Sequence, residues 1–80
     1  MLRVEVMLFG CFKGRAEGEA VMAVELPAAA TVGELRASLA ARLAGPVAES
    51  AIANEAQVLL DHHPIGRSCR LALLPPVSGG

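Results

Sequence analysis

Residues 31–46 read TVGELRASLAARLAGP, and this stretch decides the fold. Thr31 and Glu34 match a capping box, in which the threonine hydroxyl accepts from the amide three residues later and the glutamate side chain reaches back to the threonine amide. A helix is therefore expected to begin here. The pair Gly45-Pro46 is expected to end it, because glycine favours the helix C-terminus and proline cannot continue the helix.

The predicted helix has an apolar side and a polar side. Apolar residues recur every three or four positions, which is the spacing of one helix face packed on a core. The residues of this face are Val32, Leu35, Leu39 and Leu43, with Ala40 beside them. The outer side is expected to carry Glu34, Arg36, Ser38 and Arg42. Core packing accounts for this pattern, so we assign the helix no chemistry of its own.

Two strands are predicted ahead of the helix. Residues 2–8 alternate, which indicates a strand with one face on the core. The core face holds Leu2, Val4, Val6 and Leu8, and Met7 and Phe9 fall on the other face. Residues 10–18 contain three glycines and predict a loop. A second strand over 20–26 ends at Pro27, so the two strands are expected to form an antiparallel hairpin with a long connection.

Three short strands are predicted after the helix. They lie near 51–53, 57–60 and 70–74, with turns at 54–55 and 61–64 between them. The chain therefore reads as one α+β domain, in which a small mixed sheet packs on one main helix. Alternation and caps alone also permit other α+β folds.

The final residues predict a projecting tail. Pro75 and Pro76 cannot donate sheet hydrogen bonds, so the last strand must stop at Leu74. We therefore divide the chain into a domain over 1–74 and an extended tail over 75–80, which reaches at most about 20 Å. The tail ends in a carboxylate that is ionised at neutral pH and is unreactive until another enzyme activates it.

Composition argues against several functions. The net charge is −1, the basic residues are scattered, and Phe9 and Phe12 are the only aromatic residues, so nucleic-acid binding is not expected. No apolar run approaches the roughly 18 residues that span a bilayer, and Glu5 interrupts the first one. We expect neither a membrane segment nor a signal peptide, and cytoplasmic residence is the default. The hydrophobic content of 54% indicates an exposed apolar patch for a partner.

No metal or catalytic constellation stands out. Cys11 and Cys69 are too few for a zinc site or a disulfide framework, so both are expected to be thiols. His62 and His63 are adjacent and have only Asp61 near them in sequence, which favours a solvated turn over a metal site. The chain is therefore not expected to catalyse a reaction alone or to bind a cofactor.

The tail carries a resemblance to a known family. Pro75-Pro76-Val77-Ser78-Gly79-Gly80 resembles the C-terminal signature of the small subunits of molybdopterin synthase, in the MoaD/ThiS group of ubiquitin-like sulfur carriers. Phe9-Gly10, residues 27–35 and Asn54-Glu55 are also similar to family positions, so the resemblance covers nearly the whole chain. It implies the β-grasp fold, with the first and last strands parallel at the centre. Cys11 and Cys69 would then lie at opposite ends of the sheet.

The resemblance also implies a function. A ubiquitin-activating-type enzyme would use ATP to adenylate the Gly80 carboxylate, and a sulfur donor such as a cysteine desulfurase or rhodanese-like protein would convert it to a thiocarboxylate. The tail would then enter the large subunit of the synthase and deliver sulfur to precursor Z, forming the dithiolene that holds molybdenum. Gly79 would keep the tail slender and residues 75–78 would set its reach. Phe9 and Leu73 would belong to an apolar docking patch.

One departure and two alternatives remain. Residues 66–70 read GRSCR, where family members often carry an acidic turn, so a contact between this turn and the activating enzyme would be altered. The nearer alternative is a sulfur carrier for another acceptor, such as the thiazole of thiamine, a tRNA base or a protein lysine. The more distant alternative is a non-catalytic interaction module that uses only the apolar face of the sheet.

Overall fold

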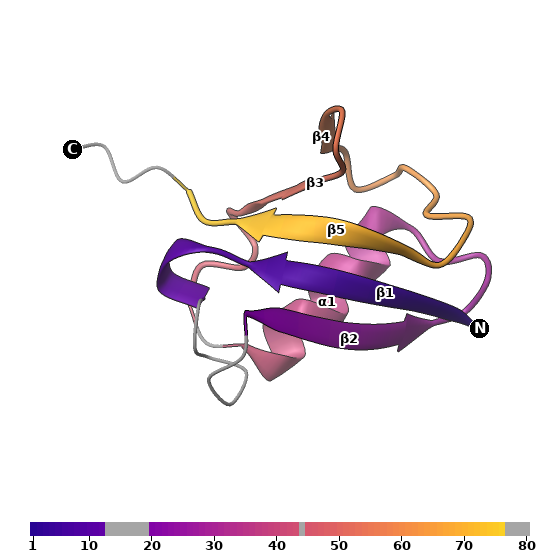
Figure 1. Cartoon of the computed structure of the whole chain (residues 1–80), viewed down its shortest axis with the longest axis horizontal. Coiled ribbons are helices and arrows are strands. Elements are labelled where there is room, and N and C mark those ends of the chain that lie inside the picture. The colour runs from indigo at the N-terminus through magenta and orange to yellow at the C-terminus, as the bar shows by residue number, and fades with distance from the viewer. Residues whose placement is uncertain (13–19, 44, 77–80) are drawn as a thin grey trace.

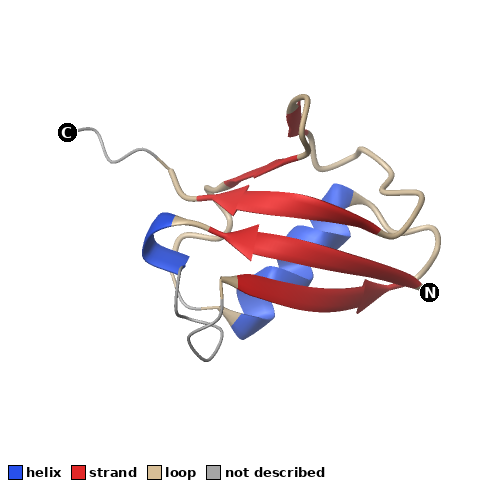
Figure 2. Ribbon diagram, in the orientation of Figure 1, coloured by secondary structure: helices blue, strands red, loops and turns tan. Residues whose placement is uncertain are grey.

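The structure is a computed structural model, and it describes residues 1–12, 20–43 and 45–76. Within these residues, five strands form one mixed sheet, and helix α1 lies across one of its faces (Figures 1 and 2). The strands are β1 (Leu2–Leu8), β2 (Val21–Leu26), β3 (Ala51–Ala53), β4 (Val58–Leu59) and β5 (Cys69–Leu74). The helices are α1 (Val32–Arg42) and the short 3-10 helix η1 (Gly10–Phe12). The predicted α+β architecture is confirmed.

Two parallel strands occupy the centre of the sheet. The strand order is β2-β1-β5-β3-β4, and β1 runs parallel to β5 from the pair Val4 and Cys69 to the pair Leu8 and Leu73. The other three pairings are antiparallel. The strand limits differ slightly from the prediction, since β2 begins at Val21, β4 has only two residues and β5 begins at Cys69.

The core lies between α1 and the facing side of the sheet. The predicted inward residues of β1 and the four apolar residues expected on the helix are all buried. Ala40 is exposed, because it lies around the helix from that face, so its assignment to the apolar side is wrong. Phe12, which the sequence placed in a loop, is fully buried from η1 and is one of the largest core side chains. None of the described helices is long and apolar enough to cross a membrane.

The start of α1 is capped twice. The Thr31 hydroxyl accepts from the Glu34 amide at 3.3 Å, and the Thr31 amide donates to Glu34 Oε1 at 3.2 Å, which confirms the capping box. The turn after β4 caps the helix as well: the amides of Val32 and Gly33 donate to the carbonyls of His63 and Asp61 at 2.9 and 2.8 Å. The histidine turn thus satisfies amides that an isolated helix leaves without partners.

Arg36 is not an outer-side residue. Its side chain is only 16% exposed, its Nε donates to Asp61 Oδ1 at 3.0 Å, and its Nη1 donates to the carbonyls of Val47 and Ser50. The residues between α1 and β3 fold back against the helix, which brings these carbonyls to the guanidinium. Arg36 therefore fastens this connection and the turn at Asp61 to one helix.

Replacing Arg36 should reveal this fastening role. Arg36→Ala leaves two partly buried carbonyls without their charged donor, and we expect the free energy of unfolding to fall by about 2 kcal/mol. Arg42→Ala makes the same change at an exposed position, where Nη1 donates a 3.4 Å hydrogen bond to the Ala23 carbonyl, and it should cost less than about 0.5 kcal/mol. Urea unfolding measures both. Equal losses in the two variants would contradict this role.

Candidate functional site

The tail leaves the sheet at the end of β5. The strand ends at Leu74, as expected from the double proline, with Pro75 half-buried and Pro76 exposed. Because β1 and β5 are parallel, the residues that follow β1 lie at this same edge of the sheet. Residues 77–80 lie outside the described part of the chain, so the roles expected for Val77, Ser78, Gly79 and Gly80 stay predictions.

Gly10 supports the first residue of the tail. Its φ is +57°, a region that favours glycine, and a Cβ built on it would lie 2.6 Å from Cγ of Pro75. A side chain at this position would therefore push Pro75 out of place. Phe9-Gly10 enters the sequence prediction only as part of the family resemblance, and this contact was not predicted. The available signal was a glycine just after a strand predicted to run parallel to the one that ends immediately before Pro75.

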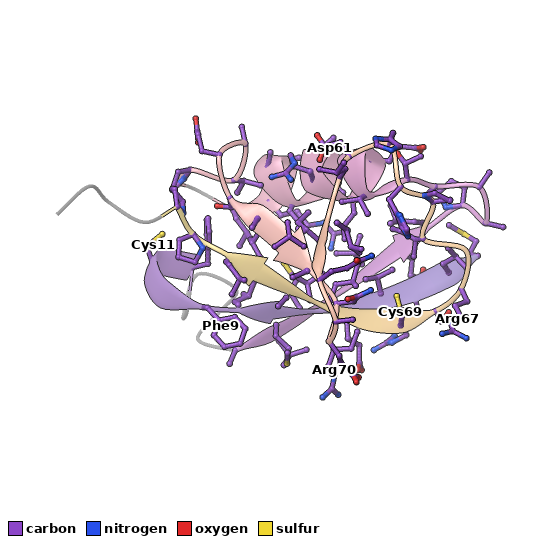
Figure 3. The ribbon with its side chains drawn as sticks, turned by 90° about the horizontal axis from the view of Figure 1, so that it is seen from above. Phe9, Cys11, Asp61, Arg67, Cys69 and Arg70 are labelled. Atoms are coloured by element: carbon purple, nitrogen blue, oxygen red, sulfur yellow. The ribbon has the colours of Figure 1, made fainter. Side chains whose placement is uncertain are left out.

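The sheet face away from α1 carries an apolar row. The strand registers place side chains from all five strands next to one another along this row. In strand order the residues are Val21, Met7, Ala72, Ala53 and Val58. The next pair toward the tail, Ala51 and Leu74, is also apolar, and Phe9 follows β1 at this end (Figure 3). We call these residues together the apolar half of the open face.

The rest of the open face is mostly charged. The row beyond Met7 pairs Glu5 with Arg70, and Arg70 Nη2 donates to Glu5 Oε1 at 2.9 Å. Arg3 and Glu25 form the next pair farther from the tail. The open face therefore has an apolar half beside the tail exit and a charged half at the opposite end, which would orient a partner.

The structure contradicts the prediction that Leu73 belongs to a docking patch. Leu73 is fully buried, because successive residues of β5 point to opposite faces and Leu73 points toward α1. Its expected place in a surface patch is therefore wrong, and its neighbour Leu74, which is 36% exposed, lies on the open face instead. Phe9 is 42% exposed, so its side chain is available for contact and its docking role stays a prediction.

The two cysteines lie far from each other. Cys11 is exposed beyond the end of β1, whereas Cys69 begins β5 beside Val4, so they sit at opposite ends of the sheet as expected. Burial raises the pKa of the Cys69 thiol, and the nearby Arg67 only partly offsets this effect. Cys69 is thus a weak nucleophile at neutral pH. Within the described residues, no three His, Cys, Asp or Glu side chains gather closely enough to hold a metal ion.

Solved structures share this fold along their whole length. SAMP1 from Haloferax volcanii is 25% identical, with 98% of this chain and 99% of that chain covered and a TM-score of 0.71. A putative molybdopterin converting factor subunit 1 from Pyrococcus furiosus is 21% identical, with 96% and 100% covered and a TM-score of 0.75. A ubiquitin from Caldiarchaeum subterraneum is 18% identical, with 99% and 98% covered and a TM-score of 0.73.

These likenesses confirm the ubiquitin-like β-grasp fold. No curated protein matches the chain. The model of one family, described as the ThiS family, matches residues 6–80, which include both the supporting Gly10 and the whole tail. On the strength of this match over almost the entire sequence, the chain belongs to the ThiS family.

Proposed function

We propose that this chain is the sulfur-carrying small subunit of molybdopterin synthase, with the sulfur held as a thiocarboxylate on Gly80. Membership of the ThiS family makes it a ubiquitin-like sulfur carrier or modifier, and the likeness to a putative molybdopterin converting factor subunit 1 favours this finer role. The observation that carries the proposal is the contact of Gly10 with Pro75, which starts the tail beside the apolar half of the open face.

The proposed chemistry needs only the terminal carboxylate from this chain. In the activating enzyme, a Gly80 carboxylate oxygen attacks the α-phosphorus of ATP and pyrophosphate leaves, which gives an acyl-adenylate. If the nucleophile is sulfide, it attacks the carbonyl carbon, AMP leaves and the thiocarboxylate forms directly. If the donor is a cysteine desulfurase or rhodanese-like protein, the outer sulfur of its persulfide attacks and AMP leaves. A second thiol then cleaves the resulting acyl disulfide, which releases the thiocarboxylate and leaves a disulfide between that thiol and the donor cysteine. ATP is thus used by the enzyme, and the chain binds no cofactor. The steps are placed in the cytoplasm, where ATP is available.

Docking and insertion are proposed to act together. The large subunit would cover the apolar half of the open face, since such patches rimmed by polar residues serve as partner surfaces. The Glu5 and Arg70 pair would mark the polar limit of the contact. With Pro75 seated on Gly10, the residues after Pro76 would enter the large subunit at one fixed angle. The activating enzyme would use the same face, so the two partners would bind in turn.

A second candidate is attachment to other proteins. SAMP1, named as a small archaeal modifier protein, shares 25% identity over nearly the whole chain. In this role a lysine amine would attack the adenylated glycyl carbonyl, so that an amide bond forms while AMP leaves and the amine loses a proton. Thiazole or tRNA sulfuration would use the same thiocarboxylate as molybdopterin synthesis. These functions differ in the acceptor and agree in their need for Gly80.

The carrier chemistry can be tested by intact mass. We expect the chain, incubated with ATP, sulfide and its adenylating enzyme, to gain the mass difference between one sulfur and one oxygen. A chain that lacks Gly80 should gain nothing, whereas Arg42→Ala, on the other side of the molecule, should react like the native chain. The carrier proposal fails if an enzyme proven active by ATP–pyrophosphate exchange on another carrier leaves the native mass unchanged.

A comparison of two glycines can distinguish the effect of Gly10 on the position of Pro75 from the effect of positive φ alone. Gly10 and Gly66 both have positive φ, at 57° and 79°, but only at Gly10 would a Cβ meet another group. Each change to alanine should cost about 1 kcal/mol of stability. Only Gly10→Ala should also slow thiocarboxylate formation, by about tenfold, because it misplaces the tail. Equal rates for the two folded variants would rule out a positioning role.

Phe9 provides a test of the docking patch. Phe9→Ala removes the largest exposed ring beside the tail, and we expect the Kd for the large subunit to rise about tenfold. Arg42→Ala, on the helix side, should leave the Kd unchanged. Calorimetric titration with the full chains gives both values. An unchanged Kd for Phe9→Ala would show that the partner binds elsewhere.

A further inference from the structure

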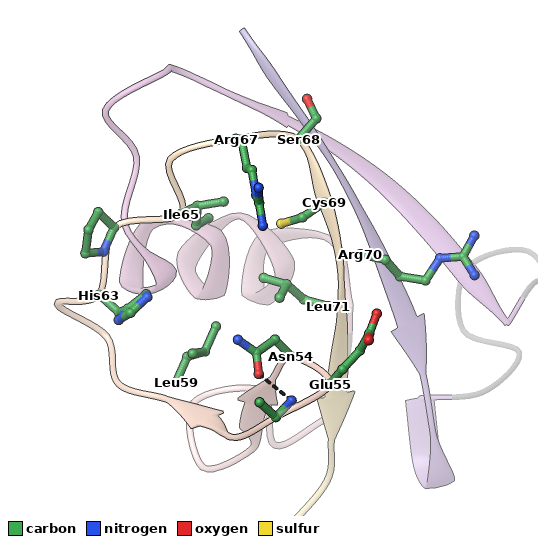
Figure 4. A pocket seen from close by; sticks show the side chains of 12 residues that line it. Asn54, Glu55, Leu59, His63, Ile65, Arg67, Ser68, Cys69, Arg70 and Leu71 are labelled. Carbon is green, nitrogen blue, oxygen red and sulfur yellow. Dashed lines mark hydrogen bonds between the residues drawn. The ribbon is translucent and has the colours of Figure 1, made fainter.

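A second candidate site lies at the opposite end of β5 from the tail. Strand β3 stops at Ala53, which pairs with Ala72, so the earlier part of β5 has no strand beside it on that side. The chain instead loops from β4 around to Cys69. A cavity of about 680 Å³ remains between the β3–β4 turn, β4, this loop and the start of β5 (Figure 4). Its volume lies within the usual range for small-ligand sites.

The cavity has an apolar floor. Leu59 of β4 and Leu71 of β5 belong to the hydrophobic core and also line the cavity, and Ile65 is half-buried between loop and core. A ligand with an apolar body would cover these side chains and remove them from water. The floor is held in place by the core, so its shape does not depend on the ligand.

One wall of the cavity offers positive charge. Arg67 points into the cavity beside Cys69, and it forms no ion pair or hydrogen bond with the described residues. Arg36 and Arg70, by contrast, are held by Asp61 and Glu5. The ring of His63 lines the same cavity, and its nitrogens offer a further donor. The guanidinium of Arg67 is thus available for an external anion.

Negative charge restricts what can bind. Glu55 lines the cavity from the β3–β4 turn, on the far side of Leu71 from Arg67 (Figure 4). It disfavours an anion with two charges or one that fills the whole cavity. The Cys69 thiol adds no negative charge at neutral pH, because burial raises its pKa. A single anionic group at the Arg67 wall, with an uncharged body toward the floor, suits this arrangement.

We propose that the cavity binds a small organic carboxylate. The carboxylate would pair with the Arg67 guanidinium and accept from His63, and its apolar body would lie on Leu59, Ile65 and Leu71. The cavity is at the other end of the sheet from the tail, so this binding is independent of the carrier function. The carboxylate could belong to a free small molecule or to the C-terminus of a peptide, since both present the same group.

The test is a titration of the ¹⁵N-labelled full chain, followed by amide chemical shifts. Benzoate probes the free carboxylate and acetyl-Gly-Gly-Leu probes a peptide C-terminus; the tighter of the two identifies the source. We expect shift changes at 54–56 and 63–71 that saturate with a Kd of about 1 mM, as suits one exposed cation. Benzyl alcohol, which lacks the carboxylate, should not saturate the site.

Three substitutions and one truncation test which residues bind the carboxylate. Arg67→Gln should raise the Kd about fivefold, and Glu55→Gln, which removes the opposing charge, should lower it. Arg42→Gln changes the same charge on the helix and should have no effect, and a chain that lacks Gly80 should bind like the native chain. The site is overturned if Arg67→Gln, with an otherwise native spectrum, binds as tightly as the native chain or if the shifts map elsewhere.

Discussion

The parallel pairing of β1 with β5 is the constraint on which the rest of the structure depends. It brings the carboxyl ends of both strands to one edge of the sheet, so the residues after β1 meet the residues after β5. Gly10 consequently lies against Pro75, and Phe9 lies at the same end as Leu74. Any slip in this pairing by one residue would exchange the inner and outer faces of β5 and abolish both the core and the apolar half of the open face.

One helix suffices to close the core because other segments hold it from both sides. The carbonyls of Asp61 and His63 accept from its first amides, and Arg36 reaches from its middle to two carbonyls of the following connection. These contacts attach the turn after β4 and the connection between α1 and β3, which contain little regular structure, to α1. The short strands β3 and β4 can therefore remain short without leaving the molecule open, and the gap beside β5 becomes a cavity.

Local patterns were sufficient to predict the elements, and they failed where contacts between elements decide the outcome. The capping box at Thr31 and the alternation over 2–8 are read within a few residues, so the sequence predicts them. Residues 71–74 are all apolar, so no alternation showed that Leu73 points inward. The roles of Arg36 and Gly10 depend on carbonyls and a proline that are distant in sequence. The chemistry proposed for the tail rests only on its motif and on the family, and it stays a prediction.

The contact between Pro75 and Gly10 limits how far the tail could reach into a partner. Because Pro75 is held against the body, the length that would enter another protein in the proposed carrier role is counted from Pro76 and comprises five residues, 76–80. Fully extended, five residues span about 17 Å. In that proposed role, a partner would have to bring its reacting atoms to within that depth of the surface on which the domain rests. The partner's channel depth would then have to match the shape of its docking surface. If either changed alone, the terminal carboxyl would no longer reach its target, so the two would have to evolve together.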